Sequence, residues 1–172
     1  MRLFIAINFN DATRSALLAL RDELRSRSER GRFSLPENLH LTLAFLGECE
    51  QRDAAPNGRL RRVMDDLSFE PFEIQVERVG RFKRDGGDIW WAGLRGCKPL
   101  IDLQRELTDK LIDAGLSLEK REYKPHITLG REIVTDAAPW QIEPFGETVY
   151  KIDLMKSERI GGRLTYTAIY KR

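Results

Sequence analysis

The sequence predicts a fold of mixed strands and helices built from two copies of one unit, each a strand, a helix and a second strand that carries a histidine. The chain of 172 residues contains two histidines, His40 and His126, which lie 86 residues apart, half the length of the chain. Each is followed by an apolar residue, a threonine and another apolar residue. The helices that precede them share a phrase, Leu-Arg-Asp-Glu-Leu in the first half and Leu-Gln-Arg-Glu-Leu in the second. We therefore expect two equivalent strands that face each other across a pseudo-two-fold axis.

The first copy of the unit lies at the N-terminus. We expect a strand over residues 2–9 and a helix that starts at Asp11, as its N-cap, and runs toward Gly31, because leucines recur along it at helical spacing. The arginines near the end of this helix are interpreted as a solvated face. A turn at Pro36 leads into the first histidine strand, which we expect to end near Gly47.

The rest of the chain alternates between helical and extended patterns. Leucines spaced three or four residues apart indicate helices, and alternating apolar and polar residues indicate strands. In chain order we expect a loop over 48–58, a short helix over 60–67, a hairpin of strands 72–82 and 88–95, a helix over 99–114 with Gly115 as its C-cap, the second histidine strand, and strands over 147–155 and 163–171. The helix over 99–114 and the histidine strand after it belong to the second copy of the unit.

Composition and charge narrow the class of protein. The chain has 29 basic and 27 acidic residues and a formal net charge of +2, so nothing demands a nucleic acid as partner, although a phosphate-bearing partner is tolerated. Its apolar runs are too short for a membrane span, and its first residues do not form a signal peptide. Two distant cysteines, Cys49 and Cys97, fit neither a zinc motif nor a disulfide scaffold. We expect a cytoplasmic protein with free thiols and no membrane contact.

The two histidine motifs place an imidazole beside a hydroxyl. Side chains of a strand alternate between its faces, so His40 and Thr42 share one face while the leucines between and after them line the other. His126 and Thr128 repeat this arrangement, with apolar residues on the opposite face. Two such strands that face each other would form a cleft with two histidines and two threonines.

Two imidazoles on opposite sides of a reacting centre can carry out an in-line displacement. One draws a proton from the nucleophile while the other protonates the leaving oxygen, and the threonine hydroxyls donate hydrogen bonds to the non-bridging oxygens. The substrate that suits this geometry is a phosphodiester, above all a strained cyclic one. Arg131 follows the second motif and can clamp a phosphate. This role requires the strand to end or bulge at Gly130, because strict alternation would turn Arg131 away from His126.

Other functions have weaker support in the sequence. A single His-x-Thr in a strand is usually structural, but two of them in a chain with no other histidine are not explained in that way. A zinc site requires three or four ligands, and no cysteine or carboxylate stands next to either histidine in sequence, so we expect no metal and no cofactor. The sequence has no Walker loop, dinucleotide fingerprint or Gly-x-Ser-x-Gly elbow.

The motifs and their flanks resemble those of the 2H phosphoesterases, in particular the prokaryotic branch called LigT or ThpR. The resemblance rests on Pro-Glu-Asn-Leu-His-Leu-Thr-Leu-Ala-Phe-Leu-Gly at 36–47 and Lys-Pro-His-Ile-Thr-Leu-Gly-Arg at 124–131. It extends through residues 79–82, 89–93 and 154–158, and so covers nearly the whole chain.

The resemblance implies a bilobal, duplicated α+β fold with two antiparallel sheets, outer helices and a central groove with pseudo-two-fold symmetry. It implies an RNA 2',3'-cyclic phosphodiesterase, which hydrolyses the cyclic phosphate end of RNA to a 2'-phosphomonoester without a metal. One motif histidine activates water and the other protonates the departing 3'-oxygen. We favour His126 as base and His40 as acid, an order that the sequence does not fix. Thr42, Thr128 and Arg131 then hold the phosphate.

The partner implied is an RNA or nucleotide with a cyclic phosphate end. We expect a monomer in which residues 1–172 form a single 2H phosphoesterase domain of two pseudo-symmetric lobes. One alternative is 2'-5' RNA ligase or 2'-5' phosphodiesterase activity on oligonucleotides, and another is an RNA-binding or nucleotide-binding module without catalysis. The hairpin tip at Lys83 and Arg84 is more basic than is usual for the family. It is either a solvated turn or an RNA-backbone contact, with Phe82 or a nearby tryptophan stacking on a base.

Overall fold

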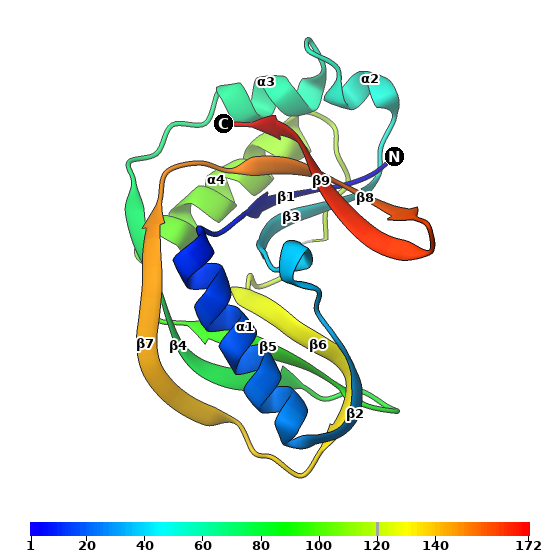
Figure 1. Ribbon diagram of the computed structural model, residues 1–172. Coiled ribbons are helices and arrows are strands. Elements are labelled where there is room, and N and C mark those ends of the chain that lie inside the picture. The colour runs from blue at the N-terminus through cyan, green and yellow to red at the C-terminus, as the bar shows by residue number, and fades with distance from the viewer. Residues whose placement is uncertain (120) are drawn as a thin grey trace.

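The computed structural model describes residues 1–119 and 121–172 and contains two antiparallel sheets with helices packed against them (Figure 1). The strands are β1 (Arg2–Ile7), β2 (Ser28–Phe33), β3 (Leu41–Glu48), β4 (Phe72–Phe82), β5 (Asp88–Leu94), β6 (His126–Thr135), β7 (Trp140–Val149), β8 (Asp153–Ile160) and β9 (Arg163–Lys171). The helices are α1 (Asp11–Ser26), α2 (Gln51–Ala54), α3 (Arg59–Asp65) and α4 (Lys98–Asp113), with a short 3₁₀ helix at Pro36–Asn38. The α+β class with two antiparallel sheets is confirmed.

The two sheets repeat one strand order around the two histidine motifs. The four-stranded sheet runs β3-β1-β8-β9 and the five-stranded sheet runs β2-β6-β5-β4-β7. In each sheet the histidine strand pairs antiparallel with the strand that precedes the helix of its own unit, β3 with β1 and β6 with β5. The predicted duplication of strand, helix and histidine strand is therefore present, and β2 is added at the edge of the second sheet.

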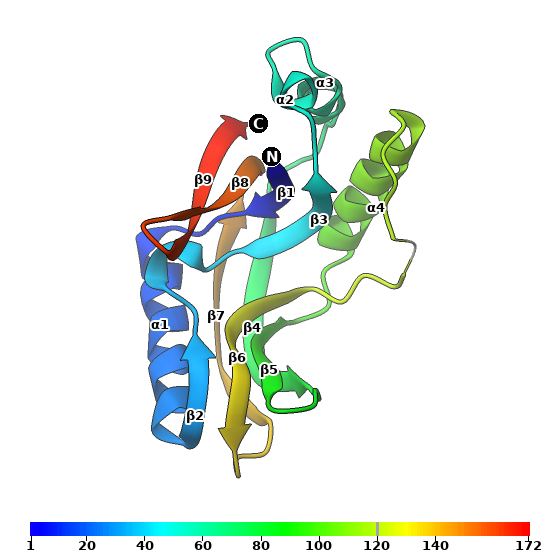
Figure 2. The same cartoon turned by 90° about the vertical axis from the view of Figure 1, so that its right-hand side faces the viewer.

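The two long helices connect the sheets. Although α1 follows β1 in the chain, it contacts β2, β6 and β7 of the five-stranded sheet, whereas α4 contacts β3 of the four-stranded sheet as well as β4. Figure 2 shows α1 and α4 on opposite sides of the molecule, with the strands between them. Each histidine strand is thus held by the helix of the other unit as well as by its own sheet.

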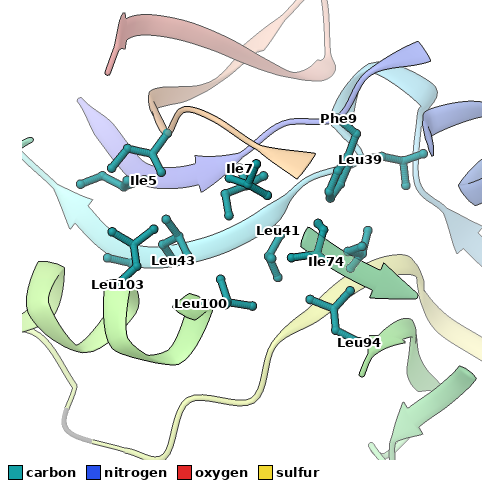
Figure 3. Packing of buried hydrophobic residues seen from close by; sticks show 14 of the residues in the cluster. Ile5, Ile7, Phe9, Leu39, Leu41, Leu43, Ile74, Leu94, Leu100 and Leu103 are labelled. Atoms are coloured by element: carbon teal, nitrogen blue, oxygen red, sulfur yellow. The ribbon is translucent and has the colours of Figure 1, made fainter. Parts of the chain in front are cut away.

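The apolar face of β3 anchors the first histidine motif. Leu41 is fully buried and Leu43 is 2% exposed. Figure 3 shows both directed toward Leu100 and Leu103 of α4. Because side chains of a strand alternate, burial of these leucines leaves the opposite face of the strand to Thr42.

The bounds of the first helix differ from the expectation. α1 ends at Ser26 rather than running toward Gly31. Its N-cap is Asn10 instead of Asp11, because the side chain of Asn10 accepts a hydrogen bond from the backbone N–H of Thr13 at 2.8 Å.

The segment after α1 forms the edge strand β2, which the sequence does not reveal. It pairs with β6, and its charged residues are those that edge strands tolerate and that obscure an alternating pattern. Two of the four arginines expected to be solvated lie over aromatic rings: the guanidinium carbon of Arg25 is 4.8 Å from the ring centroid of Phe33, and that of Arg27 is 4.5 Å from that of Trp140. These contacts attach the end of α1 to the five-stranded sheet.

The single strand predicted over 147–155 is divided between the two sheets. β7 lies at the edge of the five-stranded sheet and β8 lies inside the four-stranded sheet, so the chain passes from one sheet to the other at residues 150–152. Pro144 and Gly146 hide β7 in the sequence, since both residues usually mark loops but are accepted in edge strands and beside bulges. The register of β7 against β4 shifts close to Pro144.

The other expectations hold with small adjustments. The helices and strands expected over 60–67, 72–82, 88–95, 99–114 and 163–171 are present to within two residues, and the expected loop over 48–58 contains the short helix α2. Among the described residues no helix has the length and apolar character needed to cross a membrane. Cys49 and Cys97 are free thiols. The single-domain organisation, the monomeric state and the cytoplasmic location stay predictions.

Candidate active site

His40 directly precedes β3 and is held between two aromatic rings. Its ring centroid lies 4.9 Å from that of Phe4 in β1 and 5.2 Å from that of Tyr166 in β9. Its Nδ1 lies 2.8 Å from the carbonyl oxygen of Asn38, and its Nε2 lies 2.9 Å from Oγ1 of Thr42. Because a carbonyl oxygen only accepts, Nδ1 carries a hydrogen, and Nε2 is the ring nitrogen that could take up or release a proton.

His126 begins β6 and is held in the same way from the other sheet. Its Nδ1 lies 2.7 Å from the carbonyl oxygen of Lys124, so Nδ1 again donates and Nε2 is left for chemistry. Its ring centroid lies 5.1 Å from that of Phe82 and 6.4 Å from that of Trp91. In both motifs the carbonyl that fixes the tautomer belongs to the residue two positions before the histidine.

The two threonines have different partners. A neutral His40 accepts a hydrogen bond from the Thr42 hydroxyl at Nε2, whereas a protonated His40 donates one to it. Protonation of His40 therefore frees the hydroxyl hydrogen of Thr42 for an anionic ligand. Among the hydrogen bonds of the described residues, none joins Thr128 to His126. Thr128 lies half-buried on β6, opposite Trp91 of β5.

The positive charges of His126 and Arg131 reach His40, and that of Arg131 also reaches His126. Burial lowers the pKa of His40, and the positive charges of His126 and Arg131 act in the same direction, against the hydrogen bond to its backbone carbonyl. Burial also lowers the pKa of His126, again with help from Arg131 and, in addition, from Arg121. Both imidazoles therefore favour the neutral form more than a free histidine does. A bound anion would reverse this effect by stabilising the imidazolium.

Arg131 reaches this cluster through an irregularity of β6. The pairing of β6 with β5 shifts its register by one residue between Thr128 and Gly130. Strict alternation would place Arg131 on the face opposite His126. The shift breaks this alternation, which the proposed role of Arg131 requires. The charge of Arg131 acts on both histidines and on Tyr166. The structure thus places the two motifs where the two sheets meet, with Arg131 within electrostatic reach of both histidines.

Each motif accepts one hydrogen bond from the segment that leads into the other motif. The hydroxyl of Tyr123 donates to the carbonyl oxygen of Thr42 at 2.8 Å, and the hydroxyl of Ser34 donates to the carbonyl oxygen of Thr128 at 2.8 Å. Burial raises the pKa of Tyr123 far above its usual value, so its hydroxyl stays a donor. We call this pair of hydrogen bonds the reciprocal clasp. It fixes the position of one histidine strand relative to the other.

A pocket of about 380 Å³ opens beside His126. Its lining combines aromatic rings with cationic side chains and includes Arg78, Phe82, Trp91, Tyr123, Lys124 and His126. His40 is not part of this lining, since it lies on the other side of the junction against Phe4 and Tyr166.

The site offers proton transfer and anion binding. The described residues contain no group of three or more His, Cys, Asp or Glu side chains placed to hold a metal ion. Two imidazoles can exchange protons at Nε2, and two hydroxyls and one guanidinium can donate hydrogen bonds to the non-bridging oxygens of a phosphate.

The sequence did not predict the residues that hold the two motifs in place. Phe4, Tyr166, Tyr123 and Ser34 lie outside the two motifs, and no local pattern marks them. They could be found only once the sheets were known, because their role depends on pairings between distant segments. Phe82 was suggested by its hairpin, and it does contact His126.

Comparisons with known proteins give the family. The model of the 2'-5' RNA ligase superfamily matches residues 9–159. Over 154 residues the chain is 32% identical to the RNA 2',3'-cyclic phosphodiesterase of Archaeoglobus fulgidus, which covers 86% of this chain and 85% of that protein. Over 175 residues it is 31% identical to the RNA 2',3'-cyclic phosphodiesterase of Escherichia coli, with 98% and 93% covered.

Solved structures show the same fold. The crystal structure of E. coli LigT complexed with 3'-AMP has a TM-score of 0.84 at 26% identity and covers 99% of this chain and 96% of that one. The structure of TT0787 from Thermus thermophilus also has a TM-score of 0.84 at 26% identity, with the same coverage. The fold and its paired motifs are those of a LigT-like 2H phosphoesterase. The chain belongs to the 2'-5' RNA ligase superfamily, and its homologues over most of its length are RNA 2',3'-cyclic phosphodiesterases.

Proposed function

We propose that this protein hydrolyses the 2',3'-cyclic phosphate end of RNA to a 2'-phosphomonoester, with two histidines and no metal ion. The observation that carries the proposal is the pairing of His40 and His126. Their motifs belong to different sheets, are tied together by the reciprocal clasp, and have the same tautomer fixed by a backbone carbonyl. The named activity of the relatives from A. fulgidus and E. coli supports the same substrate.

In the proposed reaction His126 is the base and His40 is the acid. His126 takes a proton from water, the water oxygen bonds to phosphorus, the bond from phosphorus to the 3'-oxygen breaks, and His40 gives its proton to that oxygen. The Nε2 of His126, without a bond to its own threonine among the described residues, supports the choice of base. Thr42, Thr128 and Arg131 hold the non-bridging oxygens.

The test is an incubation of the protein and EDTA with a short RNA that ends in a 2',3'-cyclic phosphate. We expect a 2'-monoester as product, lost in His40→Ala and in His126→Ala. An intact cyclic end contradicts the proposed activity, and a 3'-monoester contradicts the proposed direction of ring opening.

Two other outcomes would redirect the assignment. Formation or cleavage of 2'-5' linkages in oligonucleotides, without ring opening, would favour the ligation chemistry for which the superfamily is named. RNA binding that survives both His→Ala changes, in a wild-type protein without turnover, would indicate a binding module.

A further inference from the structure

Trp91 lies flat across the five-stranded sheet beside the second histidine. In the antiparallel pairing its neighbours are Gly80 on β4 and Thr128 on β6, so its side chain lies on the same face as the second motif. The ring centroid of Phe82 is 5.3 Å away at an interplanar angle of 46°, and that of His126 is 6.4 Å away. An aromatic surface therefore adjoins the phosphate-binding residues directly.

Two glycines make room for this orientation of the indole. A Cβ atom on Gly80 would lie 2.3 Å from the six-membered ring of Trp91, and one on Gly93 would lie 2.8 Å from it. Either methyl group would push the ring off the sheet. One face of the indole thus rests on bare backbone, which fixes the plane of the ring.

The indole forms part of the wall of the pocket beside His126. The pocket volume of about 380 Å³ is at the small end of the range of roughly 300–1,000 Å³ that ligand sites span, which is room for one nucleoside. The guanidinium carbon of Arg78 lies 5.7 Å from the Trp91 ring centroid, and its Nη1 donates to the carbonyl oxygen of Leu94 at 2.9 Å. Arg78 is therefore held against the indole, with its guanidinium over the ring.

We propose that Trp91 is the stacking platform for the nucleobase of the reacting nucleotide, with Phe82 as its side wall. The inference rests on the function proposed above, because it places the base of that same substrate. Every base has an aromatic face, so a platform of this kind accepts all four bases and favours purines, which have the larger stacking area. Recognition by stacking also suits an enzyme that meets RNA ends of unrelated sequence.

The experiment compares two substrates with the same reacting ring. Adenosine 2',3'-cyclic phosphate carries a base, and the 2',3'-cyclic phosphate of methyl riboside lacks one. Stacking contributes about 1–3 kcal/mol per base, or roughly 5- to 150-fold. We expect the wild type to show a ratio of kcat/KM values of this size between the two substrates. We expect Trp91→Leu to reduce the ratio toward one and Trp91→Phe to leave an intermediate ratio.

Two controls separate stacking from indirect effects. Trp140→Leu removes an indole from β7 at the edge of the same sheet, and it should keep the wild-type ratio. A Trp91→Leu protein that loses activity equally on both substrates would overturn the proposal, because Trp91 would then only support His126. A wild-type ratio near one would overturn it without any variant, even if Trp91→Leu fails to fold.

Failure of the proposed function would be recognised separately. If the wild type hydrolyses neither cyclic phosphate, calorimetric titration with 2'-AMP and with ribose 2-phosphate takes the place of kinetics. Tighter binding of 2'-AMP that disappears in Trp91→Leu would support the platform, and equal affinities for the two ligands would overturn it.

Discussion

The two histidine motifs are alike in sequence and in backbone geometry but differ in what surrounds the reactive nitrogen. In both, a carbonyl two residues earlier holds Nδ1. His40 is packed between Phe4 and Tyr166 and bonded to its own threonine, whereas His126 borders an open pocket. Duplication thus supplies a common tautomer, while the contacts from distant strands make the two imidazoles unequal. Such inequality would favour one order of protonation in an enzyme that uses one imidazole as acid and the other as base.

Loss of either imidazole should have the largest effect. General acid–base catalysis contributes about 10²–10⁴-fold, so we expect His40→Ala and His126→Ala each to lower kcat by a factor in that range. Because the two groups act as a unit, the double variant should be little worse than either single variant. Steady-state kinetics on a cyclic-phosphate RNA gives the answer. A variant with raised KM and unchanged kcat would show that its histidine only binds.

Substitution of the threonines tests whether only the first motif couples its threonine to its histidine. Loss of one preorganised donor to a developing charge costs about 10²–10³-fold, and we expect a decrease in kcat of this order in Thr42→Val and in Thr128→Val. Only Thr42→Val should also move the pH profile of kcat/KM, because only Thr42 is bonded to a histidine Nε2. Equal pH shifts in the two variants would contradict the asymmetry.

The reciprocal clasp should matter for rate more than for affinity. Tyr123→Phe and Ser34→Ala each remove one hydrogen bond between the histidine strands, and a displacement of about 1 Å at a reacting centre costs up to about 10²-fold. We expect a lower kcat with little change in KM, and a decrease of about 0.5–1.5 kcal/mol in the free energy of unfolding. Tyr150→Phe, at a tyrosine that is 71% exposed, is the matched control. A raised KM with unchanged kcat would contradict the proposal that the clasp positions the two histidines for the reaction.

The smallest effects should be shifts in the pKa of the imidazoles. Arg131 lowers the pKa of both histidines and Arg121 lowers only that of His126, so Arg131→Gln should raise both pKa values and Arg121→Gln only that of His126. With two histidines in the chain, proton NMR titration gives two imidazole signals to follow. A shift of the acidic limb of the kcat/KM profile in Arg121→Gln is the result expected for His126 as base, and a shift of the alkaline limb would instead support the reversed order of roles.

The pH optimum follows from the same shifts. The base must be neutral, which requires a pH above its pKa, and the acid must be charged, which requires a pH below its own. Because both pKa values are lowered, both limbs of the profile for the free enzyme lie further toward acid than they would for two unperturbed histidines.

The sequence was sufficient for features that depend on local patterns. Alternation predicted β4, leucine spacing predicted α4, and the repeated His-x-Thr placed His40 and His126 at the starts of equivalent strands, β3 and β6, in two sheets. Features that depend on tertiary pairing were hidden. β2 looks like a charged helix end, and β7 contains a proline and a glycine, because an edge strand is stabilised by its neighbour more than by its own composition.

In the site, too, local patterns were predictable from the sequence and tertiary contacts were not. The residues proposed to carry protons could be named from two tetrapeptides, and the need for a bulge before Arg131 could be deduced from alternation. The partners that give each histidine its own surroundings could not, since Tyr166 and Trp91 reach the site from strands whose positions become known only when the sheets are assembled.

The backbone carbonyls that hold both Nδ1 atoms have a consequence for the timing of the cycle. In the proposed reaction one turnover leaves His126 protonated and His40 unprotonated, the reverse of what the next substrate needs. Since each ring has its second nitrogen committed to the backbone, both protons must be exchanged through the same Nε2 atoms that face the phosphate. Departure of the monoester would therefore expose both Nε2 atoms to water, so that product release and recovery of the starting protonation state are coupled in the proposed cycle.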